Sequence, residues 1–169
     1  MLSIRGSAIV KTETAMPKRS NKSLKLAAKI IKKYEGFMPQ AYLCPGGVPT
    51  IGYGSTRYEN GDEVALEDCD IDRKRGEEIL LHYIKEVADQ VQSVVKHKLE
   101  DYQEAALISF TYNLGIGNLK RSTLLQLINR GPENQNIPNE FRRWNKAGGK
   151  VLAGLTARRK EEANMWSNA

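Results

Sequence analysis

Apolar residues recur at helical spacing near the start of the chain. They are Leu24, Ala27, Ala28, Ile31 and Tyr34, and lysines occupy several positions between them. This spacing is typical of a helix that packs one face on a core and exposes the other. We predict a helix over residues 23–35, because Gly36 and Pro39 follow and both residue types end helices.

A second helical pattern covers residues 73–95, and Asp72 precedes it as a candidate N-cap. Its apolar side carries Ile79, Leu80, Tyr83, Ile84, Val87, Val91 and Val94. A helix of this length spans roughly 30 Å, which is enough to link two lobes. Further helices are predicted over residues 100–114, 122–129, 138–145 and 155–167, with glycine-containing connections between them.

The stretch between the first two helices has a different character. Residues 41–58 are rich in Tyr, Val, Ile and Thr and are interrupted by Gly and Pro, and the run Glu59-Asn60-Gly61-Asp62 is a turn signal. We predict a small antiparallel sheet over residues 41–62. The chain is therefore expected to be an α+β protein, with a small antiparallel β-sheet lobe joined by a long helix to a mainly helical lobe over residues 100–168. A cleft is expected between the two lobes.

Positive charge is concentrated at the start of the chain. Of the net charge of +6, residues 1–34 contribute +8, from nine Lys and Arg against Glu13 alone, so the other residues sum to −2. Residues 1–20 are polar and basic and contain Pro17, which predicts a flexible basic arm before a domain over residues 21–169. Such an arm favours anionic polymers or surfaces, although a simple solvated tail has the same composition.

The composition excludes several classes of protein. No apolar run is long enough to cross a bilayer, and we expect no transmembrane segment and no secretory signal. Cys44 and Cys69 are too few for a disulfide framework, and with His82 and His97 they form no metal-ligand spacing. We therefore expect no metal and no cofactor. No nucleic-acid recognition motif is present, so specific nucleic-acid binding is the least favoured function.

Glu35 is the first candidate for chemistry. It stands where the first helix is predicted to stop, beside Gly36 and Phe37. A partly apolar setting raises the pKa of a carboxyl, which suits a general acid near neutral pH. By itself this is weak evidence, because most glutamates at helix ends are solvated.

Two further residues follow at characteristic distances. Eight residues separate Glu35 from Cys44, five separate Cys44 from Thr50, and Ile-Gly-Tyr-Gly comes next. This stretch resembles the tailed-phage lysozymes, glycoside hydrolase family 24, whose members show a glutamate, eight residues, Asp or Cys, five residues and a threonine. Many relatives have aspartate where this chain has Cys44.

The resemblance continues along the chain to about residue 168. The segment Ala106 to Gly115 is similar to the family's central buried helix. Ser122 to Leu125, Phe141 to Trp144, Gly148-Gly149, Gly154-Leu155 and Arg158-Arg159 are similar to its C-terminal bundle. The resemblance thus covers residues 23–168 and implies a lysozyme-like fold. Only the basic arm lies outside it.

The resemblance also implies an activity, namely hydrolysis of the β-1,4 bond between N-acetylmuramic acid and N-acetylglucosamine in bacterial peptidoglycan. Protonated Glu35 would donate to the leaving oxygen. Cys44 would have to ionise to act as base or nucleophile, and Thr50 would hold the attacking water. Inversion and retention both remain open. By position in the resemblance, Tyr112 and Asn113 line the sugar cleft, with core packing as the alternative for the tyrosine.

Ordinary roles for these residues stay open as well. Cys44 also fits a small apolar residue in a hairpin, and Thr50 fits an ordinary strand residue. Trp144 and Trp166 suit sugar stacking, but their helical context favours core packing. A disulfide between Cys44 and Cys69 is a further hypothesis, which the cytosol would oppose.

The alternative function is a non-catalytic module that binds peptidoglycan or the envelope, and the cysteine in place of aspartate keeps it open. For the enzyme, we expect a monomer made in the host bacterial cytoplasm that reaches peptidoglycan after the membrane is permeabilised. The basic arm is expected to contact anionic envelope polymers.

Overall fold

The structure is a computed structural model that describes residues 20–168. In chain order its elements are α1 (Asn21–Glu35), β1 (Met38–Leu43), β2 (Pro49–Gly52), α2 (Arg73–Val94), α3 (Asp101–Leu114), α4 (Ile116–Arg121), α5 (Thr123–Arg130), α6 (Ile137–Arg142), β3 (Lys146–Ala147), β4 (Lys150–Val151) and α7 (Ala153–Ser167). Helices and two small antiparallel sheets together confirm the predicted α+β class. The predicted basic arm lies outside the described residues, apart from Ser20.

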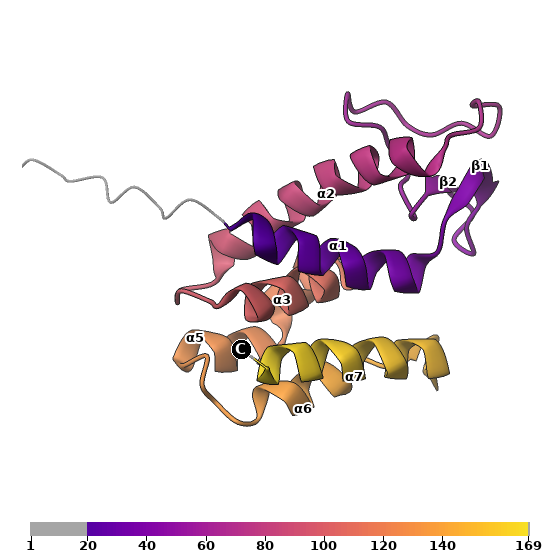
Figure 1. The fold of residues 1–169 in the computed structure, drawn as a ribbon. Coiled ribbons are helices and arrows are strands. Elements are labelled where there is room, and N and C mark those ends of the chain that lie inside the picture. The colour runs from indigo at the N-terminus through magenta and orange to yellow at the C-terminus, as the bar shows by residue number, and fades with distance from the viewer. Residues whose placement is uncertain (1–19, 169) are drawn as a thin grey trace, which may run out of the picture.

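Helix α3 is the centre of the molecule. It packs against α1 and α2 on one side and α7 on another, and Figure 1 shows it between these layers. Seven consecutive residues of α3, from Ala105 to Thr111, are buried. A helix with apolar residues all round must be enclosed by other elements. The helical lobe is therefore built around α3, as the resemblance implied.

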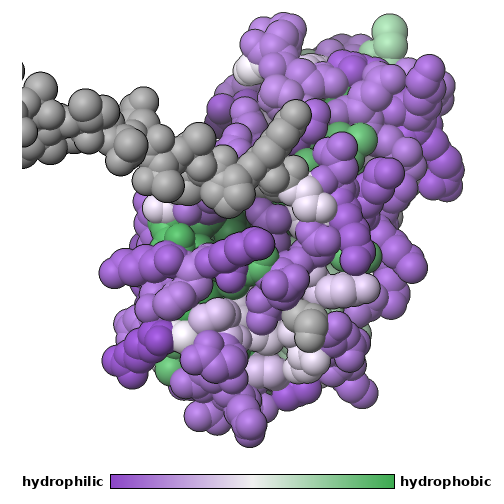
Figure 2. Space-filling view, turned by 60° about the vertical axis from the view of Figure 1, so that its left-hand side comes forward, coloured by the Kyte–Doolittle hydropathy of each residue, from purple (hydrophilic) through white to green (hydrophobic). Residues whose placement is uncertain are grey.

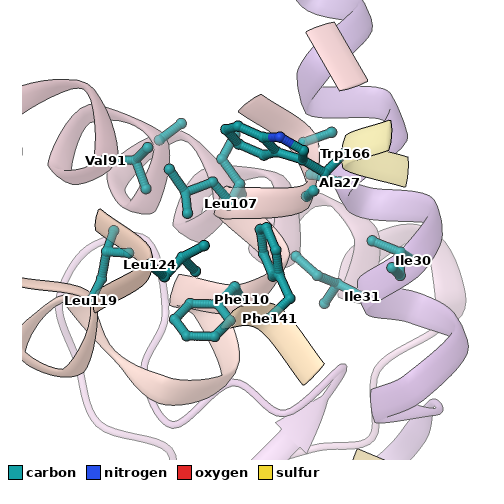
Figure 3. Close-up of a cluster of buried hydrophobic side chains, with 14 of the residues drawn as sticks. Ala27, Ile30, Ile31, Val91, Leu107, Phe110, Leu119, Leu124, Phe141 and Trp166 are labelled. Atoms are coloured by element: carbon teal, nitrogen blue, oxygen red, sulfur yellow. The ribbon is translucent and has the colours of Figure 1, made fainter. Parts of the chain in front are cut away.

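The main core receives side chains from all seven helices (Figure 3). Phe110 of α3 lies edge-on to Phe141 of α6, with ring centroids 5.5 Å apart, and to Trp144, at 5.6 Å. Trp166 is buried in the same cluster. Both tryptophans thus pack with the core, which agrees with the structural alternative considered for them.

The β lobe lies at one end of α1 and α2 (Figure 1). Strands β1 and β2 pair antiparallel, and Tyr42 faces Thr50. The first strand begins at Met38, not at residue 41, and includes Pro39, which was expected only to end the helix. Proline is tolerated on an edge strand, and the Pro39 carbonyl accepts a hydrogen bond from the Ile71 amide at 2.9 Å.

Local signals predicted several element ends correctly. Asp72 caps α2 by accepting a hydrogen bond from the Arg75 amide at 2.7 Å. Gly36 ends α1 with a positive φ of 70°, a conformation that glycine adopts without strain. The Gly61 turn forms with the Gly61 amide donating to the Tyr58 carbonyl at 2.9 Å. Helix α1 begins two residues earlier than predicted, because Ser20 supplies its cap.

Two elements were missed. Helix α4 forms where a glycine connection was expected, since Gly115 both ends α3 and begins α4 and Leu119 is buried beneath it. Helix α6 ends at Arg142, not at residue 145, and a second hairpin, β3–β4, follows. Gly148 and Gly149 have φ values of 55° and 76°, and two positive φ values are what a tight two-residue hairpin turn requires.

The surface in Figure 2 is mainly hydrophilic, with apolar side chains visible in gaps. Within residues 20–168, no helix combines the length and the apolar character needed to cross a membrane. Helix α2 is the longest, and it joins the β lobe to the helical lobe as predicted.

Candidate active site

Glu35 is the last residue of α1, and its carboxyl lies between Arg158 of α7 and Gly54 of the β lobe. The chain turns sharply at Gly36, whose amide donates to the Lys32 carbonyl at 3.2 Å. The Glu35 side chain remains 24% exposed. The sequence therefore places a carboxyl at a helix end, partly shielded but open to solvent.

The principal polar partner of this carboxyl is Arg158 of α7. Its Nη1 donates to Glu35 Oε1 at 2.6 Å, and the Arg158 side chain is only 3% exposed. The sequence predicted a partly apolar environment for Glu35 because Phe37 is nearby in the chain. That prediction was wrong. Phe37 turns toward α2 and packs beside Tyr53, with ring centroids 5.2 Å apart, while a guanidinium occupies the position next to Glu35.

The other carboxyl oxygen lies against Gly54. A Cβ built on Gly54 would stand 3.4 Å from Glu35 Oε2, and the residue has a φ of 85°. Both the conformation and the close approach favour glycine. Gly54, the last residue of Ile-Gly-Tyr-Gly, thus allows the β lobe to approach the Glu35 carboxyl closely.

Cys44 and Thr50 lie together on the β1–β2 hairpin. The backbone amides of Val48 and Gly46 lower the pKa of the Cys44 thiol, because hydrogen bonds to sulfur favour the thiolate. Thr50 is buried, and its Oγ1 donates to the Val48 carbonyl at 2.9 Å. The hairpin thus surrounds Cys44 with hydrogen-bond donors that make its thiol easier to ionise than an ordinary thiol.

Tyr42 of β1 lies within electrostatic range of both Cys44 and Glu35. Burial is the largest influence that raises the pKa of Tyr42, and the negative charges of Cys44 and Glu35 add to it. Both charges thus act on one phenol. Because Tyr42 is also the β1 partner of Thr50, Glu35, Cys44 and Thr50 belong to one region of the molecule.

The two predicted substrate residues lie on α3 behind this region. Tyr112 donates its hydroxyl to the Tyr53 carbonyl at 3.0 Å, and burial raises its pKa. Asn113 accepts a hydrogen bond from Arg159 Nη2 at 2.9 Å through its side-chain oxygen. Both side chains are partly exposed. Each already has a polar partner within the protein.

The remaining candidates lie elsewhere. Cys44 and Cys69 are free thiols, so the disulfide considered for them is not formed. His82 approaches Glu86 on the α2 surface, and His97 contacts the Asn129 carbonyl. Among the residues that the structure describes, no group of three or more His, Cys, Asp or Glu side chains is placed to hold a metal ion.

Sequence reasoning assigned no role to Arg158, Gly54 or Tyr42. The sequence did contain a pattern that indicates a role for Arg158, because charged residues recur along the face of α7 that is buried. That face consists of Arg158, Arg159, Glu162, Ala163 and Trp166. Charges at helical spacing with a tryptophan and an alanine indicate a buried ionic cluster, because lone buried charges are too costly.

The fold and this site define the class of protein. A protein-family profile described as phage lysozyme matches residues 32–162, and the chain therefore belongs to the phage lysozyme family. The match includes Glu35, Cys44 and Thr50.

Individual relatives agree with this assignment. The chain is 40% identical over 139 residues to an endolysin of Bacillus phage B103, covering 81% of this chain and 51% of that protein. It thus spans about half the length of that relative. It is similar in structure to the endolysin from Escherichia coli O157:H7 phage FAHEc1, with a TM-score of 0.75, 31% identity, and 88% of this chain and 92% of that chain covered. A crystal structure of a P22 lysozyme mutant gives a TM-score of 0.74 at 29% identity, covering 90% and 99% of the two chains. The fold is lysozyme-like.

Proposed function

We propose that this chain is a bacteriolytic endolysin that hydrolyses the β-1,4 bond between N-acetylmuramic acid and N-acetylglucosamine in peptidoglycan. The observation that carries the proposal is the partly exposed carboxyl of Glu35, held between Arg158 and Gly54 beside the Cys44–Thr50 hairpin. Membership in the phage lysozyme family supports this reaction class.

Glu35 acts as the general acid. In its protonated form it donates to the glycosidic oxygen as the C1–O bond breaks and the muramic acid ring approaches an oxocarbenium ion. Oε1 is bonded to Arg158, which leaves Oε2, on the Gly54 side, to carry the proton. Partial exposure gives the substrate access to this oxygen.

Cys44 supplies the second group that the reaction needs. As a thiolate it either removes a proton from a water that attacks C1, which inverts the anomeric centre, or attacks C1 itself. In the second case water then displaces the sulfur from C1, and the two displacements together retain the configuration. The amides that lower the pKa of Cys44 support either role. Thr50 holds the attacking water by accepting a hydrogen bond from it, because the hydroxyl proton of Thr50 is already directed to Val48.

Tyr112 and Asn113 contribute to the sugar-binding surface. The Asn113 side-chain oxygen is bonded to Arg159, so its amide nitrogen is the group available to a sugar hydroxyl. Tyr112 contributes its ring, since its hydroxyl is bonded to Tyr53.

The place of action follows from the substrate. The protein is made in the host bacterial cytoplasm and reaches peptidoglycan once the membrane is permeabilised. It acts as a monomer, and the basic arm aids adsorption to anionic envelope polymers. Deleting residues 1–20 is expected to weaken binding to walls without changing the bond that is cut, and unchanged wall binding would refute this role of the arm.

Product analysis tests the activity. Purified peptidoglycan is digested, reduced with borohydride and hydrolysed. Reduced muramic acid is expected, whereas reduced glucosamine would contradict the bond assigned. Glu35→Gln should lose at least about 100-fold in rate, within the range of general acid catalysis. Glu67→Gln, the same change at an exposed loop residue, serves as the matched control and should keep full activity.

The alternative function is a module that binds walls without cutting them. It is favoured by Cys44, which stands where the resemblance implies aspartate in many relatives. Binding to walls without release of reducing ends, in the unaltered chain, would establish that alternative. If cleavage occurs, proton NMR of the first anomer formed separates inversion from retention.

A further inference from the structure

A row of charged side chains leads from Glu35 into the interior of the protein. Arg158, Glu162 and Arg159 of α7 follow Glu35 in alternating sign. Glu162 and Arg159 have no exposed surface. Charges are buried in this way only when each has a partner.

Every nitrogen of the Arg158 guanidinium has a partner. Nη1 donates to Glu35 at 2.6 Å, Nε to Glu162 Oε1 at 3.3 Å, and Nη2 to the Ser109 carbonyl at 3.2 Å. The three bonds point in different directions from one planar group. They therefore define both the position and the rotation of the guanidinium.

Glu162 is held mainly through its Oε1 atom. The Ser109 hydroxyl donates to Glu162 Oε1 at 2.7 Å, and Oε2 lies 3.1 Å from Arg159 Nε. Burial raises the pKa of Glu162, and the guanidiniums of Arg158 and Arg159 oppose this effect. Ser109 and Arg158 both donate to Oε1, and the positive charge of Arg159 lies beside Oε2 without an aligned hydrogen bond. The geometry therefore favours the carboxylate.

This arrangement limits what Arg158 does to Glu35. A free guanidinium pairs with both oxygens of a carboxylate through two parallel bonds. Here Nε is bonded to Glu162, and Arg158 holds Glu35 through the bond from Nη1 to Oε1. The one positive charge of Arg158 also interacts with two carboxylates, those of Glu35 and Glu162.

We infer that Glu162 is a positioning residue that acts on Glu35 through Arg158, turning the guanidinium so that it holds Glu35 Oε1 and leaves Oε2 to carry the proton. The inference rests on the proposed role of Glu35 as general acid. Glu162 touches no substrate in this scheme. Its negative charge offsets Arg158, which would otherwise drive Glu35 toward its ionised form.

Other charged or ionisable groups also act on the Glu35 carboxyl. A variant must therefore be compared with a reference chain in which these groups are the same. Those that interact electrostatically with it include Tyr42 from the β lobe, Tyr112 from α3, and Arg158 and Arg159 from α7. None of them is altered by substituting Glu162 alone.

The experiment compares pH profiles of wall clearing by the full chain. Glu162→Gln keeps the side-chain shape and removes the charge. The alkaline limb, where the general acid loses its proton, is expected to move to lower pH by about one unit. Ser109→Ala is the control, because it removes hydroxyl hydrogen bonds to Glu162 and Arg158 but no charge, and its alkaline limb should stay in place. An unmoved limb in Glu162→Gln, or an equal shift in Ser109→Ala, would overturn the inference.

A second variant covers the case in which Glu162→Gln does not fold, since it leaves Arg159 without a buried counter-charge. Arg159→Gln combined with Glu162→Gln removes both charges and still frees Arg158 to act on Glu35 alone. Its alkaline limb should lie below that of Arg159→Gln alone, which carries the same change at position 159, and identical limbs in these two variants would count against the inference.

One readout does not depend on activity. Carboxyl-13C glutamate labelling reports the ionisation of Glu35, with its signal assigned by its loss in Glu35→Gln. The signal should titrate at lower pH in the Glu162 variants than in the unaltered chain, and identical titrations would overturn the inference. If Glu35→Gln still cleared walls, the proposed function would fail while this titration still tested the charge coupling.

Discussion

The Tyr112 hydroxyl donates to the Tyr53 carbonyl at 3.0 Å and joins the central helix α3 to the β lobe. Tyr53 precedes Gly54, the residue against which Glu35 Oε2 lies. This single hydrogen bond therefore connects the helical lobe to the segment that approaches the carboxyl.

Tyr112→Phe should lower both stability and activity. Loss of the hydrogen bond leaves the Tyr53 carbonyl without its partner and should cost about 1 kcal/mol of unfolding free energy, or roughly 2–4 °C in melting temperature. Activity should fall several-fold because the Gly54 segment loses its anchor. Tyr83→Phe is a matched control, since Tyr83 donates to the Tyr58 carbonyl at 3.1 Å. Equal activity losses in both variants would contradict this prediction.

Gly54→Ala should reduce activity more than its effect on folding explains. The residue has a φ of 85°, and the new Cβ would press on Glu35 Oε2. The positive φ should cost ~1–2 kcal/mol. Gly61→Ala carries the same backbone strain, with a φ of 92° and no atom within 4 Å of the new Cβ. Chemical denaturation should give similar losses for both, while wall clearing should drop strongly only for Gly54→Ala.

Cys44 should be the more reactive of the two thiols. Amides of Val48 and Gly46 lower its pKa, and the thiolate is the form that reacts with iodoacetamide. In chains that keep one cysteine each, Cys69→Ser should be alkylated several-fold faster at pH 7 than Cys44→Ser. Alkylation of Cys44 should also stop wall clearing. Equal alkylation rates, measured by mass spectrometry, would argue against a stabilised thiolate.

Two tyrosines should make the fold sensitive to alkaline pH. Burial, together with hydrogen bonds to Asp68 and Glu161, raises the pKa of Tyr58 and of Tyr34 to about 12 in the folded chain. An unfolded tyrosine titrates near pH 10. The folded state keeps these protons longer, so their stabilisation is complete below about pH 10 and is lost as pH rises toward 12.

Melting temperatures measured between pH 8 and pH 12 test this expectation. The unaltered chain should lose stability above about pH 10. Tyr58→Phe should start from lower stability, because the hydrogen bond to Asp68 at 2.9 Å is gone, but should fall less steeply. A slope equal to that of the unaltered chain would show that Tyr58 makes no contribution.

Much of the architecture could be predicted because its signals are local. The α1 pattern, the glycine at its end and the Asp72 cap act within a few residues, and each formed as predicted. Helix α4 and the β3–β4 hairpin were missed because glycine was interpreted as a break. In the structure, Gly115 serves two helices and Gly148-Gly149 forms a turn between strands.

By itself, the sequence determined where Glu35, Cys44 and Thr50 stand relative to a helix end and a hairpin, since spacing and turn residues act over short distances. Only the tertiary structure decided what surrounds Glu35. Arg158 lies 123 residues further along the chain, and no local pattern specifies which carboxylate a distant guanidinium will contact. Packing of α7 against α3 and α1 brings the two together, because buried charges must find partners wherever the fold places them.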